Sequence, residues 1–314
     1  MPMVRVRFSN FWNGFNKADN LFVEMLSEIY GHVNLEPTGK QQKYDLEISS
    51  VFSSKRRYLY KKIQALKRDQ HQAFLHDKDF YRTSQYLLLN QNVTRRVWYT
   101  GENIRPPLDP NFDGFLSFDQ DAYGGVNSYL PLWQLYFRNQ MSTYISPSLG
   151  TEYPVDKFLQ ERKPTDESRR FVCAFINNPD PYRLRAIQTL RKYGEVDIYG
   201  KSFGNFAKDK VSVGSRYRFV LAFENDHFPG YVTEKIFDAY AANAIPLYWG
   251  CLGRETLINE NSIIDTNRFQ DLDHFASYVG NMDKATWKKT YSEPLLLQLP
   301  NLNSAKRILI GGMR

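Results

Sequence analysis

Residues 219–250 hold the side chains whose types and spacing are best suited to chemistry. An apolar run ends in Asn225, a loop containing Gly230 follows, and Thr233 and Lys235 open a helical pattern that leads to a second apolar run. The pattern predicts a strand, a helix with Thr233 as its N-cap, and a second strand, which is one βαβ unit. Such a unit places a helix N-terminus at the carboxyl edge of a parallel sheet. Backbone N–H groups and the Lys235 ammonium attract anions there, so the segment predicts a phosphate or diphosphate site.

Two regions of alternating strands and helices would position this site. We expect strands at 4–8, 45–49, 96–100 and 114–118 and a helix at 20–30 in the first region, and strands at 170–175, 196–200 and from Arg218, with a helix at 181–192, in the second. The segment 147–167, rich in Pro, Ser and charges, is typical of a linker. We expect two further helical stretches at 269–278 and 284–297, and the sequence leaves open on which of the two regions they pack.

The length favours two domains, because 314 residues exceed the size of about 250–300 at which single cores stop growing. We expect an α/β protein with two Rossmann-like domains that face each other across a cleft: 1–150 binding an acceptor and 151–314 binding a nucleotide. No Gly-rich dinucleotide fingerprint or Walker loop follows any predicted strand, which counts against dehydrogenases and P-loop enzymes. The pattern favours a nucleotide-sugar transferase.

The charge is basic and unevenly spread. The net charge is +7 and the pI about 9.1. One predicted helix within 55–68 gathers seven cations: Lys55, Arg56, Arg57, Lys61, Lys62, Lys67 and Arg68. This face is either solvated or in contact with anionic lipid. No nucleic-acid-binding signature accompanies it, so we expect no nucleic-acid partner.

The sequence contains no apolar run of the roughly 18–20 residues that a transmembrane helix needs, and its first residues lack a signal-peptide core. Cys173 and Cys251 lie in apolar, strand-like sequence, which predicts buried free thiols. We therefore expect a cytoplasmic protein, with peripheral contact to the inner face of the membrane as the alternative that the basic helix raises. The oligomeric state stays open.

Three Asp-x-Asp sequences have the spacing of a metal-diphosphate site. They are 77–79, 119–121 and 271–273. The second is best placed, after a predicted strand, but it lies in a different domain from the predicted anion site. We therefore expect no metal site and no required cofactor. Stimulation by Mn²⁺ stays open.

Several motifs together resemble the α1,3/4-fucosyltransferases of the bacterial type, in glycosyltransferase family ten. They are 223–225 (FEN), 230–236 (GYVTEKI), 238–240 (DAY), 245–250 (IPLYWG) and, upstream, Asn177, Arg183 and 196–200, with a weaker match at 99–103. The resemblance implies a B-type (GT-B) glycosyltransferase fold. It also implies inverting transfer of L-fucose from GDP-β-L-fucose to a hydroxyl of an N-acetyllactosamine-type glycan.

The resemblance also implies roles for particular residues. Arg183 and Lys235 match residues that bind the diphosphate, and Tyr231 and Glu234 match residues that contact the nucleotide sugar. Asn225 stands at the end of a strand, where a ligand contact is expected. An arginine grips phosphate oxygens with two parallel hydrogen bonds and a lysine adds a point charge, so the pair can replace a metal. Core packing is the alternative for Tyr231, and a surface cation is the alternative for Arg183.

Transfer to a hydroxyl also requires a general base. Glu102 follows a predicted strand in a Gly-Glu-Asn turn, and it matches the position of the base in the family. A residue that merely caps the turn is the alternative. Trp12, in the loop after the first strand, resembles an acceptor-side aromatic, because rings stack on the apolar faces of sugars. Local packing is the alternative for Trp12.

The predicted acceptor is N-acetyllactosamine, as in Lewis antigens, or a lipopolysaccharide O-chain. The sequence does not distinguish α1,3 from α1,4 linkage, because acceptor choice depends on variable loops. Two other functions stay open. One is a B-type transferase that uses a different nucleotide sugar, and the other is a non-enzymatic glycan- or nucleic-acid-binding protein. Thermal stabilisation by GDP but not by UDP separates the fucosyltransferase from the second transferase.

Overall fold

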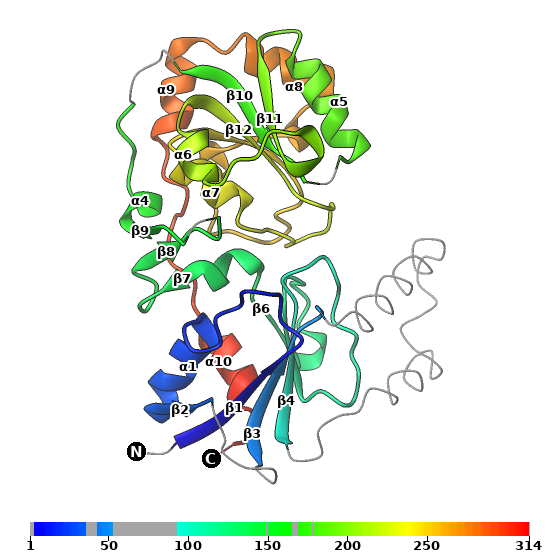
Figure 1. Cartoon of the computed structure of the whole chain (residues 1–314), viewed down its shortest axis with the longest axis vertical. Helices are drawn as coiled ribbons and strands as arrows, with labels where there is room; N and C mark the ends of the chain where they lie inside the picture. The colour runs from blue at the N-terminus through cyan, green and yellow to red at the C-terminus, as the bar shows by residue number, and fades with distance from the viewer. Residues whose placement is uncertain are drawn as a thin grey trace. The chain divides into compact units, whose positions relative to one another are not determined.

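The chain forms two compact α/β units (Figure 1). The computed structural model describes residues 3–35, 43–52, 93–148, 150–164, 169–177 and 179–313. Unit 1 comprises Met1–Leu135 and Asn301–Arg314, and unit 2 comprises Tyr136–Pro300. The division lies at 135, whereas the sequence analysis placed it at 150, and the C-terminal segment belongs to unit 1.

Unit 1 is built on a parallel sheet with the strand order β2-β1-β3-β4-β5-β6. Its strands are β1 (Met3–Ser9), β2 (His32–Asn34), β3 (Tyr44–Ser49), β4 (Val93–Tyr99), β5 (Gly114–Ser117) and β6 (Asn127–Tyr129). In β1 the buried residues alternate, so Val4, Val6 and Phe8 enter the core. The order places β2 and β3 on opposite sides of β1, which makes the carboxyl ends of β1 and β3 a topological switch point.

Two α-helices of unit 1 are described, and they pack against each other (Figure 1). Helix α1 (Leu21–Tyr30) begins after Asn20, whose side chain accepts a hydrogen bond from the Val23 N–H. Helix α10 (Asn303–Ile310) packs on β5 and β6. Arg95 donates to the carbonyl oxygens of Ile308 and Leu309, which satisfies the end of α10. The 3₁₀ turns η1 (Tyr123–Gly125) and η2 (Leu132–Tyr136) follow β5 and β6.

Unit 2 contains a second parallel sheet, with the order β11-β10-β12-β13-β14, and a small antiparallel sheet, β7-β8-β9. The strands are β7 (Phe137–Arg138), β8 (Thr143–Ile145), β9 (Glu152–Pro154), β10 (Arg170–Phe175), β11 (Val196–Tyr199), β12 (Tyr217–Phe223), β13 (Ile245–Trp249) and β14 (Ile264–Asp265). Strand β12 is buried almost throughout, as expected of a central strand covered on both faces. The switch point of this sheet lies between β10 and β12.

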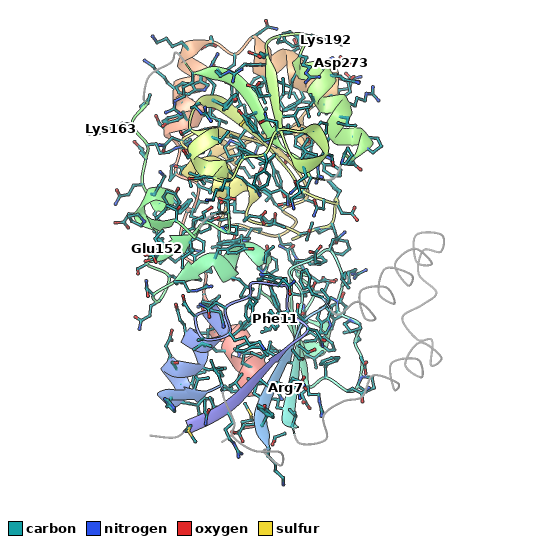
Figure 2. The ribbon with its side chains drawn as sticks, viewed as in Figure 1. Arg7, Phe11, Glu152, Lys163, Lys192 and Asp273 are labelled. Atoms are coloured by element: carbon teal, nitrogen blue, oxygen red, sulfur yellow. The ribbon has the colours of Figure 1, made fainter. Side chains whose placement is uncertain are left out.

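The helices of unit 2 are α4 (Asp156–Leu159), α5 (Pro181–Leu190), α6 (Lys210–Gly214), α7 (Lys235–Ala241), α8 (Leu272–Gly280) and α9 (Lys284–Ser292), with 3₁₀ turns η3 (Lys201–Phe203), η4 (Glu260–Ser262) and η5 (Thr266–Arg268). Helix α5 begins at the predicted residue, Pro181, which occupies the first helical position, and the Asp180 side chain caps the helix. It packs against α8, and the ion pair between Lys192 and Asp273, with 2.6 Å between Nζ and Oδ1, lies at this contact (Figure 2).

The predicted linker 147–167 is wrong for its described part. Residues 150–164 include β9 and α4, and they belong to unit 2. The reason is Phe158, whose side chain is fully buried against Phe137, Tyr144 and Phe237. Burial of this one aromatic side chain removes a large apolar surface from water, and this stabilises a folded structure for the segment despite its loop-like composition.

The basic helix predicted within 55–68 and the Asp-x-Asp sequence at 77–79 lie outside the described residues. Both cysteines are free, as predicted. Cys173 is also buried as predicted, whereas Cys251 is partly exposed, so the prediction of burial was wrong for Cys251. Burial raises the pKa of the Cys173 thiol, so it stays protonated. Among the described residues, no helix is both long and apolar enough to span a bilayer.

Candidate functional site

A buried carboxylate organises the switch point of the unit 2 sheet. Glu224 directly follows β12, and its side chain is completely buried. Its Oε1 accepts from the Thr233 N–H at 2.8 Å, and its Oε2 accepts from the Thr233 hydroxyl at 2.8 Å and from the Lys235 ammonium at 2.9 Å. Lys235 Nζ also donates to Thr233 Oγ1 at 2.8 Å. We call Glu224, Thr233 and Lys235 the Glu224 clamp; it joins the two ends of the loop 225–232.

The clamp corrects one prediction and refines another. Thr233 is not the N-cap of α7; the N-cap is Glu234, whose side chain makes no capping hydrogen bond. The reason is that Glu224 already binds both the N–H and the hydroxyl of Thr233. The Lys235 charge is at the predicted place, but it is paired, and the side chain is 24% exposed. The site is therefore an internally compensated cluster and not a bare cation at a helix end.

The pKa values follow from this geometry. Burial lowers the pKa of Lys235, but the carboxylates of Glu224 and Glu234 outweigh burial, and the net shift is upward. Burial raises the pKa of Glu224, against the opposing pull of Lys235 and the Thr233 N–H. For Glu234, burial acts upward, yet Lys235 and Lys210 produce a net downward shift of the pKa. Lys235 and Glu234 are therefore charged at neutral pH.

Arg183 reaches the same strand end from helix α5. Its side chain is mostly buried, and Nη2 donates to the Phe223 carbonyl at 3.1 Å, to the Glu224 carbonyl and to Asn225 Oδ1 at 2.9 Å. Burial lowers the pKa of Arg183, while Asp180 and Glu224 oppose that shift. Arg183 thus holds the main chain of Glu224 while the clamp holds its side chain. The structure brings Arg183, Asn225 and Lys235 together, as the sequence analysis expected.

The other predicted residues of this region differ in exposure. Tyr231 is 2% exposed, which favours the packing alternative for its side chain. Glu234 is half-buried. The loop 225–232 turns at Gly230, whose φ is +84°. The Gly230 N–H donates to the Cys251 carbonyl at 2.8 Å. Tyr231 therefore shapes the loop, and Glu234 stands closer to solvent.

Sequence reasoning missed Gly250 as a requirement of the site. A Cβ at this position would lie 2.3 Å from the Tyr248 hydroxyl and 3.0 Å from Glu224 Cγ. Glycine at this position leaves room chiefly for the buried Tyr248 ring and also keeps the contact with the Glu224 side chain from becoming tight. The sequence signal for Gly250 was a glycine directly after an apolar run. The sequence signal for Glu224 was a carboxylate at the end of the preceding apolar run.

Asp238, on helix α7, is a second buried carboxylate close to the clamp. Its Oδ1 accepts from the Tyr144 hydroxyl at 3.0 Å and from the Ser146 hydroxyl at 2.9 Å. Burial raises the pKa of Asp238 to about 6; the Glu234 charge adds to that shift, while Lys210 and the two hydroxyls oppose it. Asp238 therefore connects α7 to the segment around β8.

In unit 1, Glu102 lies in the turn after β4. Thr100 Oγ1 accepts from the Glu102 N–H at 3.1 Å and donates to the Glu102 carbonyl at 2.9 Å, so the backbone of the turn is fixed. Glu102 is half-buried, and its carboxylate has no hydrogen-bond or ion-pair partner among the described residues. Burial, followed by the Glu102 charge, raises the pKa of the neighbouring Tyr99. Glu102 is thus positioned by its main chain, and its carboxylate is available.

Trp12 belongs to a cluster of rings in the loop after β1. Its ring centroid lies 5.1 Å from that of Phe15 and 5.4 Å from that of Phe52. Phe11 (Figure 2) stacks nearly parallel on Tyr99, with centroids 6.0 Å apart. We call Phe11, Trp12 and Phe15 the aromatic loop. This packing connects Trp12 to the end of the strand that precedes Glu102, and Trp12 itself is half-buried.

The described Asp-x-Asp sequences have local partners. Asp119 pairs with Arg105 Nε at 3.0 Å and accepts from the Tyr123 hydroxyl at 2.5 Å. Asp271 caps α8, and Asp273 pairs with Lys192. Within the described residues, no group of three or more His, Cys, Asp or Glu side chains is arranged to hold a metal.

Comparison with known proteins identifies the region that holds the clamp. Residues 165–293 match the family model described as glycosyltransferase family 10 (fucosyltransferase) C-term. The resemblance predicted from the motifs is confirmed for this region, which includes Arg183, the Glu224 clamp and Asp238.

Curated relatives match a larger part of the chain. The alpha-(1,3)-fucosyltransferase FucT of Helicobacter pylori is 27% identical over 231 residues, covering 66% of this chain and 48% of that protein. The human 4-galactosyl-N-acetylglucosaminide 3-alpha-L-fucosyltransferase FUT5 is 36% identical over 197 residues, covering 58% of this chain and 51% of that protein. The chain thus spans about half the length of these relatives.

Solved structures match nearly the whole chain in fold. One, described as a crystal structure of alpha1,3-fucosyltransferase, has a TM-score of 0.67 and 21% identity, and the match covers 98% of this chain and 90% of that one. A second, described as alpha1,3-fucosyltransferase with GDP-fucose, has a TM-score of 0.64 and 22% identity, covering 97% and 85%. These matches confirm the predicted α/β fold of the GT-B type.

Proposed function

We propose that this chain, whose residues 165–293 carry the C-terminal domain of glycosyltransferase family 10, is a fucosyltransferase that uses GDP-fucose as its donor. The observation that carries the proposal is the coincidence of the family match with the Glu224 clamp at the switch point of the unit 2 sheet. The names of the relatives and the GDP-fucose in a structure of the same fold support it.

In the proposed reaction, unit 2 stabilises the GDP leaving group. A lysine ammonium has three protons. Lys235 donates two of them to Glu224 and Thr233, which leaves one for a phosphate oxygen. Arg183 adds positive charge and fixes the end of β12, and Asn225 and Glu234 contact the nucleotide sugar. The clamp prepares this arrangement before the donor binds, so little ordering is needed on binding.

Unit 1 supplies the general base. The acceptor hydroxyl oxygen attacks the anomeric carbon of fucose, its proton passes to the Glu102 carboxylate, and the bond from that carbon to the diphosphate oxygen breaks as GDP leaves with the electron pair. The anomeric centre is inverted in this single displacement. The support for Glu102 is that its backbone is fixed while its carboxylate has no partner among the described residues.

The proposed acceptor is a GlcNAc hydroxyl of an N-acetyllactosamine-type glycan, free or within a lipopolysaccharide O-chain. We propose α1,3 linkage, with α1,4 linkage as the alternative product. Trp12 contacts the acceptor through the exposed part of its ring. No metal is required in this scheme, although Mn²⁺ stimulation is compatible with it. The cytoplasmic location and the membrane contact of the basic helix stay predictions.

The test is incubation with GDP-fucose and N-acetyllactosamine in EDTA, followed by mass spectrometry and linkage analysis. We expect a gain of one deoxyhexose and release of one GDP. Transfer only after Mn²⁺ is added would contradict the metal-free scheme. Transfer from another nucleotide sugar but not from GDP-fucose, with thermal stabilisation by UDP and not by GDP, would favour the alternative GT-B transferase.

A further inference from the structure

A pocket of about 300 Å³ lies beside β14, at the edge of the unit 2 sheet. The buried side chains of Ile263 and Ile264 line it, together with the rings of Phe269 and Tyr278, whose centroids are 5.2 Å apart. A volume of this size is at the lower end of those found for small-molecule sites. We call it the β14 pocket. None of its lining residues belongs to the Glu224 clamp, so it is a separate candidate site.

The polar side chains of the β14 pocket include both hydrogen-bond donors and acceptors. Within the described part of the chain, the Lys289 ammonium and the Thr290 hydroxyl have no hydrogen-bond or ion-pair partner. Asp265 accepts from Asn267 through Oδ1, and Glu293 accepts from Asn259 through Oε2 at 3.0 Å. The second oxygen of each carboxylate therefore remains for another donor.

This mixture selects a class of ligand. Two carboxylates, Asp265 and Glu293, balance the two cations of the lining, and one of these cations, Arg268, is already paired with Glu260, so the pocket has no net positive charge to favour an anion such as phosphate. The same four charged side chains oppose a purely apolar molecule. A neutral sugar ring has hydroxyls that both donate and accept, and it has an apolar C–H face that packs on an aromatic ring. Tyr278 offers such a ring, because its side chain is 42% exposed at the pocket.

We propose that the β14 pocket binds one neutral pyranose unit of a glycan chain, other than the unit that receives the transferred sugar. This inference rests on the proposed function, since a glycan-modifying enzyme brings a chain of several sugar units to its surface. Tyr278 stacks on the ring, Lys289 and Thr290 donate to its oxygens, and Asp265 and Glu293 accept from its hydroxyls. Long acceptors consequently bind more tightly than short ones.

The experiment compares two acceptors by calorimetry and by steady-state kinetics with the full chain. They are N-acetyllactosamine and a hexasaccharide of three N-acetyllactosamine units. We expect Tyr278→Ala to weaken hexasaccharide binding about tenfold, which is the loss of about 1.4 kcal/mol, and to raise the hexasaccharide KM by the same factor. Lys289→Ala is expected to act in the same direction. The disaccharide KM, kcat and GDP affinity stay unchanged.

Two control variants make the outcome specific. Tyr278→Phe keeps the ring and is expected to keep hexasaccharide binding, whereas Tyr193→Ala removes an exposed tyrosine outside the pocket and is expected to have no effect. Melting temperatures verify folding of each variant. Equal affinity of the wild type for both acceptors overturns the inference, and so does an equal loss in Tyr193→Ala. Selective hexasaccharide binding without fucose transfer contradicts the proposed function but supports the pocket.

Discussion

The two parallel sheets of this chain share one topology but differ in what stands at their carboxyl ends. In each, the first strand lies between the second and the third, so each has a switch point beside its first strand. In unit 2 the switch point holds a buried ion pair between Glu224 and Lys235, and Arg183 donates to the main-chain carbonyl of Glu224. In unit 1, Glu102 has a fixed backbone and an unpartnered carboxylate among the described residues, and the aromatic loop packs nearby.

Under the proposed function, this difference suits the two sheets to two different tasks. A diphosphate is recognised by charge, and the charges that bind it are costly to bury unless they are paired before the ligand arrives. A general base must instead keep its carboxylate available for a proton, so partners would compete with its function. The predictions below disrupt the pairing in unit 2 or the availability in unit 1.

The largest effect is expected for Glu224→Ala. Removal of the carboxylate leaves Lys235 and Thr233 without their shared partner in a buried position, which costs about 3–5 kcal/mol of unfolding free energy. Urea denaturation measures the loss. Glu224→Gln keeps an acceptor for Thr233 and is expected to lose less. Because the two residues form one pair, the loss in Glu224→Ala/Lys235→Ala should be smaller than the sum of the single losses; additive losses would contradict the clamp.

Glu102→Gln tests the other side of the comparison. We expect turnover to fall about 100-fold or more, with GDP affinity and melting temperature nearly unchanged, because the carboxylate supports no other described group. The matched control is Glu152→Gln, an exposed glutamate in unit 2 (Figure 2), which should leave turnover intact. A collapse of GDP affinity in Glu102→Gln would show a structural or donor-binding residue and not a base.

Lys235→Ala separates the ligand contact from the clamp. The loss of one charge-assisted hydrogen bond to phosphate should weaken GDP binding by about 1.5–3 kcal/mol in a titration. Burial of Glu224 without its cation should also lower stability, so the titration is made well below the melting temperature. Unchanged GDP affinity would place the diphosphate elsewhere.

Asp238→Asn is expected to have the smallest effect and to depend on pH. Wild-type Asp238 has a pKa of about 6 against an ordinary 3.8, so the folded state retains the proton between these values. Stability contributed by this group is therefore lost as pH rises from about 4 to 6, on the order of 1–2 kcal/mol. Asparagine does not titrate, so the variant should gain stability relative to wild type as pH rises through this window. Urea denaturation at pH 4.5 and 7.5 measures the unfolding free energy of both proteins. If the difference between the two proteins is the same at both pH values, the buried, ionisable state of Asp238 is contradicted.

Much of the framework could be predicted from local patterns. The apolar run ending at Phe223 and the Asp180-Pro181 start of α5 correspond to β12 and α5, because strand burial and helix capping depend on residues that are close in sequence. The motifs around Lys235 likewise predicted the family that residues 165–293 match. The linker prediction was wrong because of long-range packing: Phe158 packs against rings far away in the sequence, among them Phe137 and Tyr240.

By itself, the sequence determined the main strands and helices of the two regions, the family of the second half and the residue types at the strand ends. Only the tertiary structure decided which of these side chains are already bound to one another. Glu224 meets Lys235 across a loop, and Arg183 meets the carbonyls of β12 from a different helix. Periodicity and capping are local properties of the chain, whereas the partner of a buried charge is whatever folding brings within hydrogen-bond distance, and that distance is not encoded at any single position.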